Sequence, residues 1–261
     1  MSKFIFAANF KCNHTRRSFQ EYAEILEQNL QEISALNLKT DPTQPPVCKN
    51  LNTLNTKLNS ANLLDEVIVF PPSSAFLSTK FSFTQGAQNF YPCENGAFTG
   101  EIGAQNLAEF GINCVLIGHS ERREILGETD EILKAKFDFA VQKSWKIIFC
   151  IGESLEIYES KKTSEYLKNQ LKIINLTYPN LYIAYEPIWA IGSGKTPNIE
   201  EIEQILGEIR TLSDAPLLYG GSVNLANIRA ISSTKNCDGV LVGGASLDAQ
   251  NFTNLIKETK C

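Results

Sequence analysis

Hydrophobic and polar positions along this chain form two alternating patterns. Short, nearly continuous apolar runs that are rich in β-branched and aromatic residues are typical of buried strands. Eight such runs occur, at Phe4–Phe10, Val67–Phe70, Phe83–Gln88, Cys114–Gly118, Lys146–Ile151, Leu181–Tyr185, Pro216–Tyr219 and Gly239–Val242. Between the runs, apolar residues recur every three or four positions, which predicts amphipathic helices.

Two of the helical stretches combine an apolar stripe with a start signal. One stripe comprises Phe19, Tyr22, Leu26, Leu30 and Ile33, and the other comprises Ile202, Ile205, Leu206 and Ile209. A small polar residue followed three positions later by glutamate forms a capping box, which Ser18-x-x-Glu21 and Asn198-x-x-Glu201 both match. We therefore expect helices to begin at these two places.

The alternation of strands and helices predicts an α/β protein with a parallel sheet. The length of 261 residues suits a single (β/α)8 barrel domain, for which about 250 residues are typical. Eight parallel strands with outer helices over residues 1–261 are therefore expected. An open, doubly wound sheet is the alternative, but no G-x-G-x-x-G follows the first strand, so a dinucleotide-binding fold lacks its main signal.

The segment at about 34–65 is predicted to be an insertion between the first helix and the second strand. Asp41-Pro42 breaks any continuing helix, and asparagine, threonine and lysine dominate the residues after it. Either a short outer helix or a polar loop fits this composition, because helical spacing is kept only by Leu51, Leu54 and Leu58. Such a connection lies on the amino-terminal face of a barrel, opposite the catalytic loops.

Charge and hydropathy narrow the classes of partner. The 24 basic and 29 acidic residues give a formal charge of −5 that is spread along the chain rather than concentrated in blocks. This balance favours neither nucleic acid nor an anionic membrane surface. The apolar run near the amino end is too short to span a bilayer and lacks a cleavage site, so we expect a cytoplasmic protein.

Cysteine and histidine usage bears on metals and redox state. The seven cysteines are irregularly spaced and contain no C-x-x-C pair, which is typical neither of a disulfide framework nor of a zinc site. With only His14 and His119 in the chain, a histidine-based metal centre is not expected. The sequence therefore predicts neither a metal nor another cofactor.

Glu186 is the first candidate for chemistry. In a barrel, polar residues just beyond the carboxyl ends of the strands meet on one face, and Glu186 directly follows the apolar run Leu181–Tyr185. Loss of water there should raise its pKa toward that of a general base, although a strand-end glutamate also fits a helix cap. The following stretch, Ala190–Gly194, lies between a stiff Pro-Ile-Trp and a Lys-Thr-Pro, which predicts a mobile lid with two hinges.

Three more side chains lie at or near predicted strand ends. His119 precedes Ser120-Glu121, which we interpret as the first turn of a helix, and the positive end of that helix disfavours imidazolium and leaves a neutral donor. Lys11 follows the first strand and would place its ammonium group in the barrel mouth. Cys150 is expected to be a packing residue, with no base beside it.

Paired glycines at the ends of the last two strands favour a phosphate site. They are Gly220-Gly221, directly before Ser222, and Gly243-Gly244. Backbone N–H groups at such turns bind dianionic phosphate, and the loops after strands seven and eight are where barrels usually place that site. Each pair taken singly also fits a plain tight turn.

Taken in order, several strings of this chain resemble the triosephosphate isomerase family. They are N-F-K-x-N from Asn9, GAFTGEIG from Gly96, IGHSERR from Ile117, CIGE from Cys150, AYEPIWAIGSGKTP from Ala184, YGGSV from Tyr219 and LVGGASL from Leu241. They span nearly the whole chain apart from the predicted insertion. Phe10, where the family usually has Trp, and Cys12, where Met is frequent, are read as packing changes.

The resemblance implies a TIM barrel enzyme that interconverts dihydroxyacetone phosphate and D-glyceraldehyde 3-phosphate through an enediolate, in glycolysis and gluconeogenesis. By position, Glu186 would move the proton and His119 would be the neutral electrophile. Asn9 would hold the carbonyl oxygen, and Lys11 would supply positive charge. Glu121 would position Lys11.

The resemblance also implies how the phosphate and the lid are held. Gly192, Ser222, Gly243 and Gly244 would bind the substrate phosphate, and Tyr219 together with Ser222 would hold the closed lid. Closure protects the intermediate, because an enediolate phosphate that is exposed to water can eliminate its phosphate.

A homodimer is implied as well. The loop Gln88–Glu101 resembles the protruding loop that the family inserts beside the active site of a second subunit, with Thr99 as the residue that reaches it. Two alternatives are a catalytically silent barrel that acts as a binding protein and another phosphosugar-binding barrel enzyme. Loss of Glu186, His119 or Lys11 would mark the first, but all three are present. The lid string and HSERR argue against the second.

Overall fold

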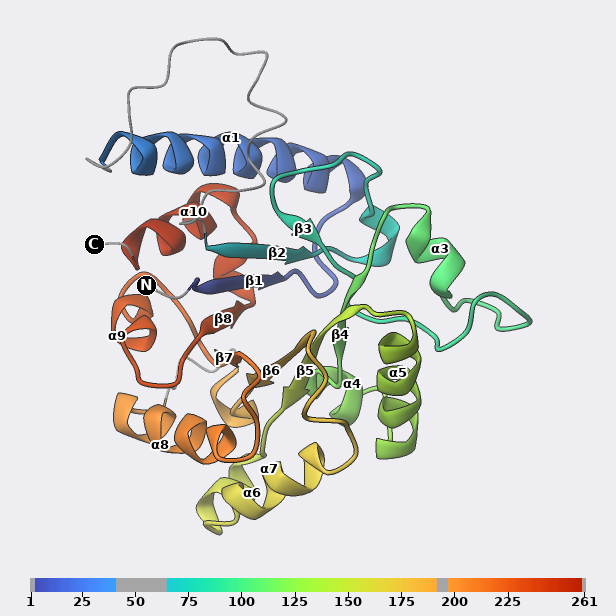
Figure 1. The fold of residues 1–261 in the computed structure, drawn as a ribbon, viewed down its shortest axis with the longest axis vertical. Coiled ribbons are helices and arrows are strands. Elements are labelled where there is room, and N and C mark those ends of the chain that lie inside the picture. The colour runs from blue at the N-terminus through green and yellow to red at the C-terminus, as the bar shows by residue number, and fades with distance from the viewer. Residues whose placement is uncertain (1–2, 41–64, 192–196, 260–261) are drawn as a thin grey trace.

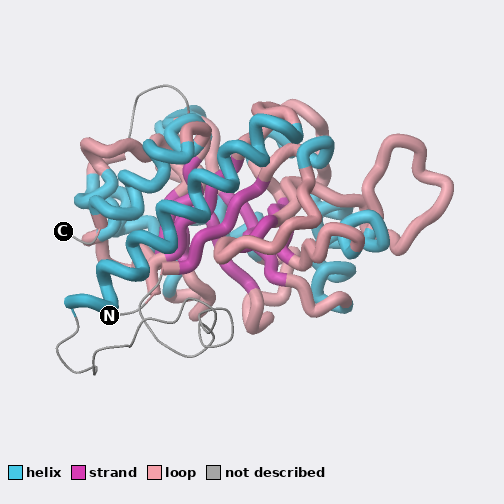
Figure 2. The backbone as a smooth tube through the Cα atoms, turned by 90° about the horizontal axis from the view of Figure 1, so that it is seen from above, coloured by secondary structure: helices cyan, strands magenta, loops and turns pink. Residues whose placement is uncertain are grey.

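The structure is a computed structural model that describes residues 3–40, 65–191 and 197–259. Within these ranges, parallel strands curl into a barrel whose outer surface is covered by helices (Figure 1). Figure 2 shows the strands enclosed by the helices when the molecule is seen from above. The fold is therefore the predicted α/β barrel.

The described chain contains eight strands in the spatial order β3-β2-β1-β8-β7-β6-β5-β4. Their bounds are β1 Ile5–Asn9, β2 Glu66–Phe70, β3 Thr84–Gln85, β4 Cys114–Ile117, β5 Lys146–Ile151, β6 Leu181–Tyr185, β7 Leu217–Tyr219 and β8 Gly239–Val242. All eight predicted strands are confirmed, although β3 is shorter than expected. A parallel bridge between Ala87 and Val115 joins the two ends of the sheet and closes the barrel.

The connections between strands are mostly helical, as expected for parallel strands. The helices are α1 Arg16–Thr40, α3 Ala104–Ala108, α4 Ser120–Glu124, α5 Asp130–Gln142, α6 Leu155–Glu159, α7 Thr163–Leu171, α8 Ile199–Arg210, α9 Ile228–Ser232 and α10 Ala249–Glu258. Short 3-10 turns are η2 Ser73–Ala75, η3 Ile188–Ala190 and η4 Gly244–Ser246. No helix in the described ranges has the length and apolar character needed to cross a bilayer.

One of the two predicted capping boxes is confirmed and the other is wrong. Asn198 and Glu201 exchange reciprocal bonds at the start of α8. At α1, however, the helix begins at Arg16, ahead of the predicted Ser18 cap. Thr15 and Ser18 form the reciprocal pair there, since each backbone N–H donates to the hydroxyl oxygen of the other residue. Thr15 offers the same spacing three residues earlier, so the helix gains most of a turn.

Apolar side chains fill two layers. The barrel interior is packed by residues from alternate strand positions, namely Ile5, Ala7, Ile68, Phe70, Cys114, Leu116, Ile148, Cys150, Ala184, Leu218 and Leu241. The second layer lies between the strands and the helices and contains the whole predicted α1 stripe, Phe19, Tyr22, Leu26, Leu30 and Ile33. A filled interior leaves the rim of the barrel as the place for a site.

The predicted insertion at about 34–65 falls largely outside the described residues, which omit 41–64. At its amino end, α1 continues through Thr40, the residue before Asp41-Pro42. At its carboxyl end, β2 begins at Glu66, which pairs with Ile5 at the start of β1. Because α1 runs back along β1 and β2, the chain leaves and re-enters at the amino-terminal end of the strands (Figure 1).

Candidate active site

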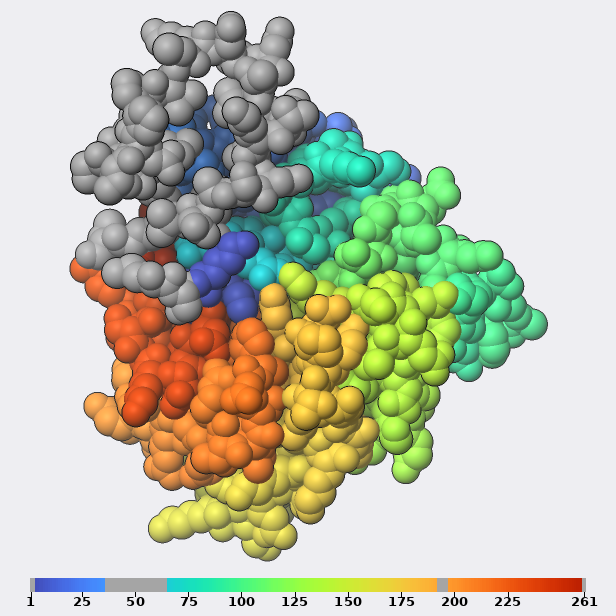
Figure 3. Space-filling view, viewed as in Figure 1, coloured from blue at the N-terminus to red at the C-terminus, as the bar shows by residue number. Residues whose placement is uncertain are grey.

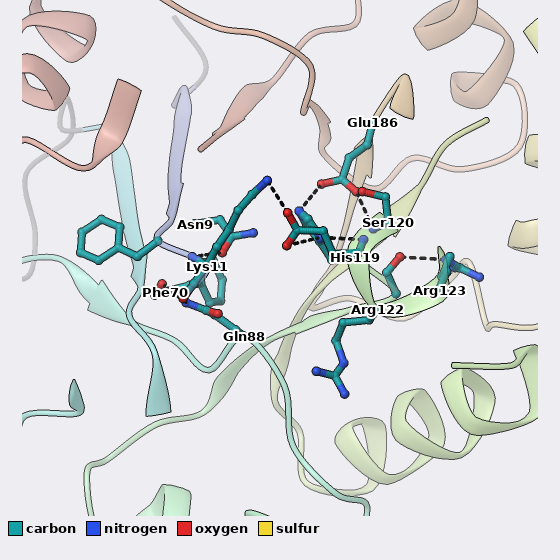
Figure 4. Close-up of polar contacts among 12 residues, drawn as sticks. Asn9, Lys11, Phe70, Gln88, His119, Ser120, Arg122, Arg123 and Glu186 are labelled. Atoms are coloured by element: carbon teal, nitrogen blue, oxygen red, sulfur yellow. Dashed lines mark hydrogen bonds and ion pairs between the residues drawn. The ribbon is translucent and has the colours of Figure 1, made fainter. Parts of the chain in front are cut away.

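The structure brings together the five predicted catalytic side chains at the carboxyl end of the barrel. Figure 4 shows Asn9, Lys11, His119 and Glu186 converging on one space from three different strands. Asn9 ends β1 and Lys11 lies in the turn after it, whereas His119 and Glu121 follow β4. Glu186 follows β6 directly, as predicted.

Glu186 is a buried carboxylate held between two partners. Its side chain is only 2% exposed, and its Oε2 accepts a hydrogen bond of 3.2 Å from the backbone N–H of Ser120. Its Oε1 lies 3.3 Å from Nε2 of His119. Burial raises the pKa of Glu186, and this effect outweighs the lowering by His119, the Ser120 N–H and Lys11. The predicted rise in pKa is confirmed, which leaves a carboxylate suited to accept a proton.

His119 is oriented by the helix that follows it. It is the N-cap of α4, and its Nδ1 accepts a hydrogen bond of 3.2 Å from the backbone N–H of Glu121. An Nδ1 atom that accepts carries no proton, so the ring proton is on Nε2, which faces Glu186. The predicted start of a helix after His119 is confirmed, and the geometry presents a neutral imidazole as a hydrogen-bond donor.

Lys11 is held in place through contacts of its backbone and of its ammonium group. Its φ of 52° is in the left-handed region, and its N–H donates to Asn9 Oδ1 at 3.0 Å. Gln88 Nε2 donates to the Lys11 carbonyl at 2.9 Å. At the far end of the side chain, Nζ lies 2.7 Å from Oε1 of Glu121. A positive charge is thus fixed beside the His119–Glu186 pair.

Two glycines allow Glu186 to sit this close to neighbouring backbone. A Cβ atom on Gly152 would lie 1.8 Å from the Glu186 carbonyl oxygen, and one on Gly220 would lie 2.8 Å from Glu186 Cγ. Both positions therefore require glycine for packing around the carboxylate. Our sequence reasoning did not assign this role, and the signal available for it was the glycine that directly follows each of the neighbouring strands.

Arg123 is a second feature that the sequence analysis did not assign. Its Nε donates to the Gly118 carbonyl at 2.8 Å, and its Nη2 donates to the Cys150 carbonyl at 3.1 Å. The guanidinium therefore joins the carboxyl ends of β4 and β5, directly next to His119. The double arginine in HSERR was visible in the sequence, but the carbonyls that it binds were not.

The expectation that no base stands beside Cys150 is wrong. The thiol is fully buried, and Glu186 is near enough for its charge and a hydrogen bond to act on it. Both effects add to desolvation and raise the pKa of Cys150 well above its usual value. The thiol therefore stays protonated, and its place in the barrel interior agrees with the expected packing role.

The predicted phosphate-binding residues lie at neighbouring strand ends. Ser222 is half-buried after β7, Gly243 follows β8, and Gly244 begins η4. A Cβ on Gly243 would lie 3.8 Å from Cε of Lys11, so this turn borders the lysine side chain. Gly244 faces open space, since a Cβ there would meet nothing within 4 Å. Gly192 lies outside the described residues.

The predicted lid is described only at its start. The 3-10 turn η3 follows Glu186 closely, and within it Trp189 Nε1 donates to Glu153 Oε1 at 3.0 Å. Residues 192–196 lie outside the described ranges, so the lid remains a prediction. Tyr219, which was expected to hold the lid, is buried, and its hydroxyl has no hydrogen-bond partner among the described residues.

A cavity of about 620 Å³ adjoins the catalytic side chains. It is lined by Asn9, Lys11 and His119 and also by Gly100 and Glu101 from the loop before α3. Apolar side chains such as Phe76 and Leu116 also line the cavity.

Comparison with known proteins shows what this chain is similar to. A sequence model described as triosephosphate isomerase matches residues 32–259. The triosephosphate isomerase of Campylobacter concisus (strain 13826) is 54% identical over 96% of this chain and 97% of the relative. Those of Campylobacter jejuni subsp. jejuni serotype O:2 and Sulfurovum sp. (strain NBC37-1) are 51% and 44% identical, each over 97% of this chain and 99% of the relative.

The chain belongs to the triosephosphate isomerase family. Membership confirms the predicted enzyme class and the predicted (β/α)8 barrel. It also confirms the reaction predicted from the sequence, the interconversion of dihydroxyacetone phosphate and D-glyceraldehyde 3-phosphate. The alternatives of a silent binding protein and of a different phosphosugar enzyme are not favoured.

Proposed function

We propose that Glu186 is the base that moves the proton between the two carbons of the triose phosphate, with His119 as the electrophile. The observation that carries this assignment is the 3.3 Å separation between Glu186 Oε1 and His119 Nε2, with both side chains buried. A carboxylate with a raised pKa accepts a proton from carbon, and a neutral Nε2–H donates to the oxygen that becomes negative. Loss of isomerase activity in Glu186→Gln tests this proposal.

Lys11 and Asn9 complete the proposed site around the substrate oxygen. The enediolate carries negative charge, and the Lys11 ammonium group is the cation that Glu121 Oε1 holds at 2.7 Å. Asn9 is 5% exposed and fixes the Lys11 backbone through its Oδ1, and its amide NH2 group, which bonds to none of the described residues, can donate toward substrate. Glu121 acts through Lys11 and is therefore a positioning residue.

The substrate phosphate is proposed to bind between the turns after β7 and β8. Support comes from the half-buried Ser222 and Gly243 and from the open space in front of Gly244. Glycine has no side chain, so its backbone N–H group can approach phosphate oxygens closely. Lys11 borders Gly243, so the cation and the amides would act on one substrate. Gly192 would also bind the phosphate, and the lid segment would cover it, with Tyr219 and Ser222 holding the closed form.

We also propose a homodimer formed through the loop Gln88–Glu101. In Figure 1 the loop between β3 and α3 projects from the barrel, and Figure 3 shows the same segment standing away from the body of the molecule. Thr99 is exposed at this projection, and the adjacent Phe98 is 42% exposed. Leu126, which lines the cavity beside the site, is 62% exposed and the preceding Ile125 is 75% exposed, which gives a partner loop an apolar surface to cover.

The reaction is proposed to take place in the cytoplasm, as a step of glycolysis and gluconeogenesis. The irregular cysteine pattern of the sequence and the phosphorylated substrate support this location.

A further inference from the structure

His14 joins two loops that both border the active site. Its Nε2 lies 3.0 Å from the carbonyl oxygen of Leu247, which is 233 positions away in the sequence. A carbonyl oxygen only accepts, so Nε2 is the donor. The other ring nitrogen, Nδ1, lies 3.2 Å from Oγ of Ser18 in the first turn of α1. One ring therefore connects the turn after β1, the start of α1 and the turn after β8.

The ring is held in place from its sides as well. It lies over Phe10 with ring centroids 4.7 Å apart, and it meets Tyr22 edge-on at 5.7 Å. The His14 backbone has a φ of 73°, in the left-handed region that side chains with a Cβ rarely adopt. A half-buried, oriented ring on such backbone persists only where the surrounding contacts determine it.

Leu247 ends the turn that contains the paired glycines. Around η4, the Leu247 N–H donates to the Gly244 carbonyl at 3.2 Å, and the Ser246 N–H donates to the Gly243 carbonyl at 2.9 Å. A bond to the Leu247 carbonyl therefore acts on a unit that includes Gly243 and Gly244. No sequence pattern links this unit to His14, and the contact arises from the pairing of β1 with β8.

On the other loop, His14 follows Lys11 by three residues. Lys11 borders the glycine turn directly, because a Cβ on Gly243 would lie 3.8 Å from Lys11 Cε. The His14–Leu247 bond thus spans the same gap between the ends of β1 and β8 that separates the Lys11 side chain from the glycine N–H groups. Of the two hydrogen bonds of the His14 ring, the one to Leu247 is the bond that joins the two loops.

We propose that His14 is a positioning residue that holds the glycine turn after β8 against the Lys11 loop, so that both bind one substrate. The inference rests on the proposed phosphate site at Gly243 and Gly244. His14 should affect substrate binding rather than proton transfer, because Glu186 and His119 follow β6 and β4, away from the paired strands β1 and β8.

The test compares two substitutions of His14. His14→Asn tolerates the left-handed backbone and can still reach Ser18, but it is too short to reach Leu247, whereas the amide of His14→Gln matches the place of Nε2. In His14→Asn, loss of one ordering hydrogen bond should raise the KM for D-glyceraldehyde 3-phosphate and the inhibition constant of inorganic phosphate about three- to tenfold, with kcat within about twofold. His14→Gln should restore most of this loss.

Gly243→Val alters the proposed phosphate site itself. It therefore distinguishes a failure of the His14 positioning role from a failure of the phosphate site. If inorganic phosphate binds His14→Asn as tightly as wild type but binds Gly243→Val weakly, the His14 inference is overturned and the phosphate site stands. Wild-type binding by both variants would overturn the phosphate site. A fall in kcat at unchanged KM, or no recovery in His14→Gln, would also overturn the positioning role. Should His14→Asn not fold, His14→Gly suits the backbone and removes the same bond.

Discussion

The carboxylate of Glu186 lies 3.3 Å from Nε2 of His119, and the two side chains are 2% and 8% exposed. The Nδ1 atom of the same ring accepts from the Glu121 backbone, so the face toward Glu186 carries the proton. A buried acceptor and a buried donor therefore share one space at the mouth of the barrel. Proton transfer beside a carbonyl group needs this pair of functions together.

Replacing Glu186 by glutamine should abolish nearly all isomerase activity and leave binding of inorganic phosphate almost unchanged. The amide keeps the shape of the side chain but cannot accept a proton, and a general base typically contributes about 10²- to 10⁴-fold. A coupled assay with D-glyceraldehyde 3-phosphate measures the loss. Activity within about tenfold of wild type would rule out Glu186 as the base, since this is less than a general base contributes.

The same substitution should stabilise the protein at neutral and alkaline pH. Burial raises the pKa of Glu186 in the folded state above the unfolded value of about 4.3, so the folded chain favours the protonated carboxyl. Wild-type stability therefore falls as the pH rises from about 4.3 through the folded pKa, and the neutral glutamine avoids this fall.

Thermal unfolding between pH 5 and pH 8 measures the effect. The advantage of Glu186→Gln over wild type should be larger at pH 8 than at pH 5. Glu109→Gln removes the same charge from an exposed position and should show no such trend. A Glu186→Gln variant that is less stable than wild type at pH 8 would contradict the prediction.

Gly243→Val should raise the KM for the phosphorylated substrate more than it lowers the melting temperature. The first added atom fits, because it would lie 3.8 Å from Lys11 Cε, but the branched side chain would cover the backbone N–H groups. Inhibition by inorganic phosphate reports binding, and thermal unfolding controls for folding. Equal phosphate affinity in the variant and wild type would show that the site has been misplaced.

Thr99→Arg should weaken the proposed dimer. Thr99 is exposed on the projecting loop, and burying an unpaired guanidinium at an interface is strongly unfavourable. Sedimentation velocity across a dilution series measures association. Thr177→Arg places the same charge on an exposed loop at the opposite end of the barrel and should leave association intact. A Thr99→Arg variant that stays dimeric at high dilution argues against this interface.

Replacing residues 39–62 with a short Gly-Ser linker should leave kcat/KM within about threefold of wild type, a barrier change below ~1 kcal/mol. Activity should be kept because α1 ends and β2 begins at the amino-terminal end of the strands, opposite Glu186. The coupled assay and the melting temperature are the two measurements. A folded, dimeric variant with a hundredfold loss of kcat/KM would mean that the insertion reaches the active site.

Much of the architecture was readable from local sequence pattern. Leu181–Tyr185 was predicted with its observed bounds because a buried parallel strand is apolar on both faces and ends where polar residues begin. Glu186 was readable for the same reason, since the strand end determines its place. The start of α1 was not readable in this way, because the sequence predicted a cap at Ser18, whereas in the structure the helix begins ahead of that position and Thr15 and Ser18 bond to each other.

Contacts across the barrel were decided only by the tertiary structure. The register of β5 on β6 brings Cys150 beside Glu186, which no spacing along the chain reveals. The bond from His14 to Leu247 likewise depends on β1 pairing with β8. Periodicity reports which face of a segment is buried, whereas the partner on that face depends on strand order and register, which are set by packing the whole chain at once.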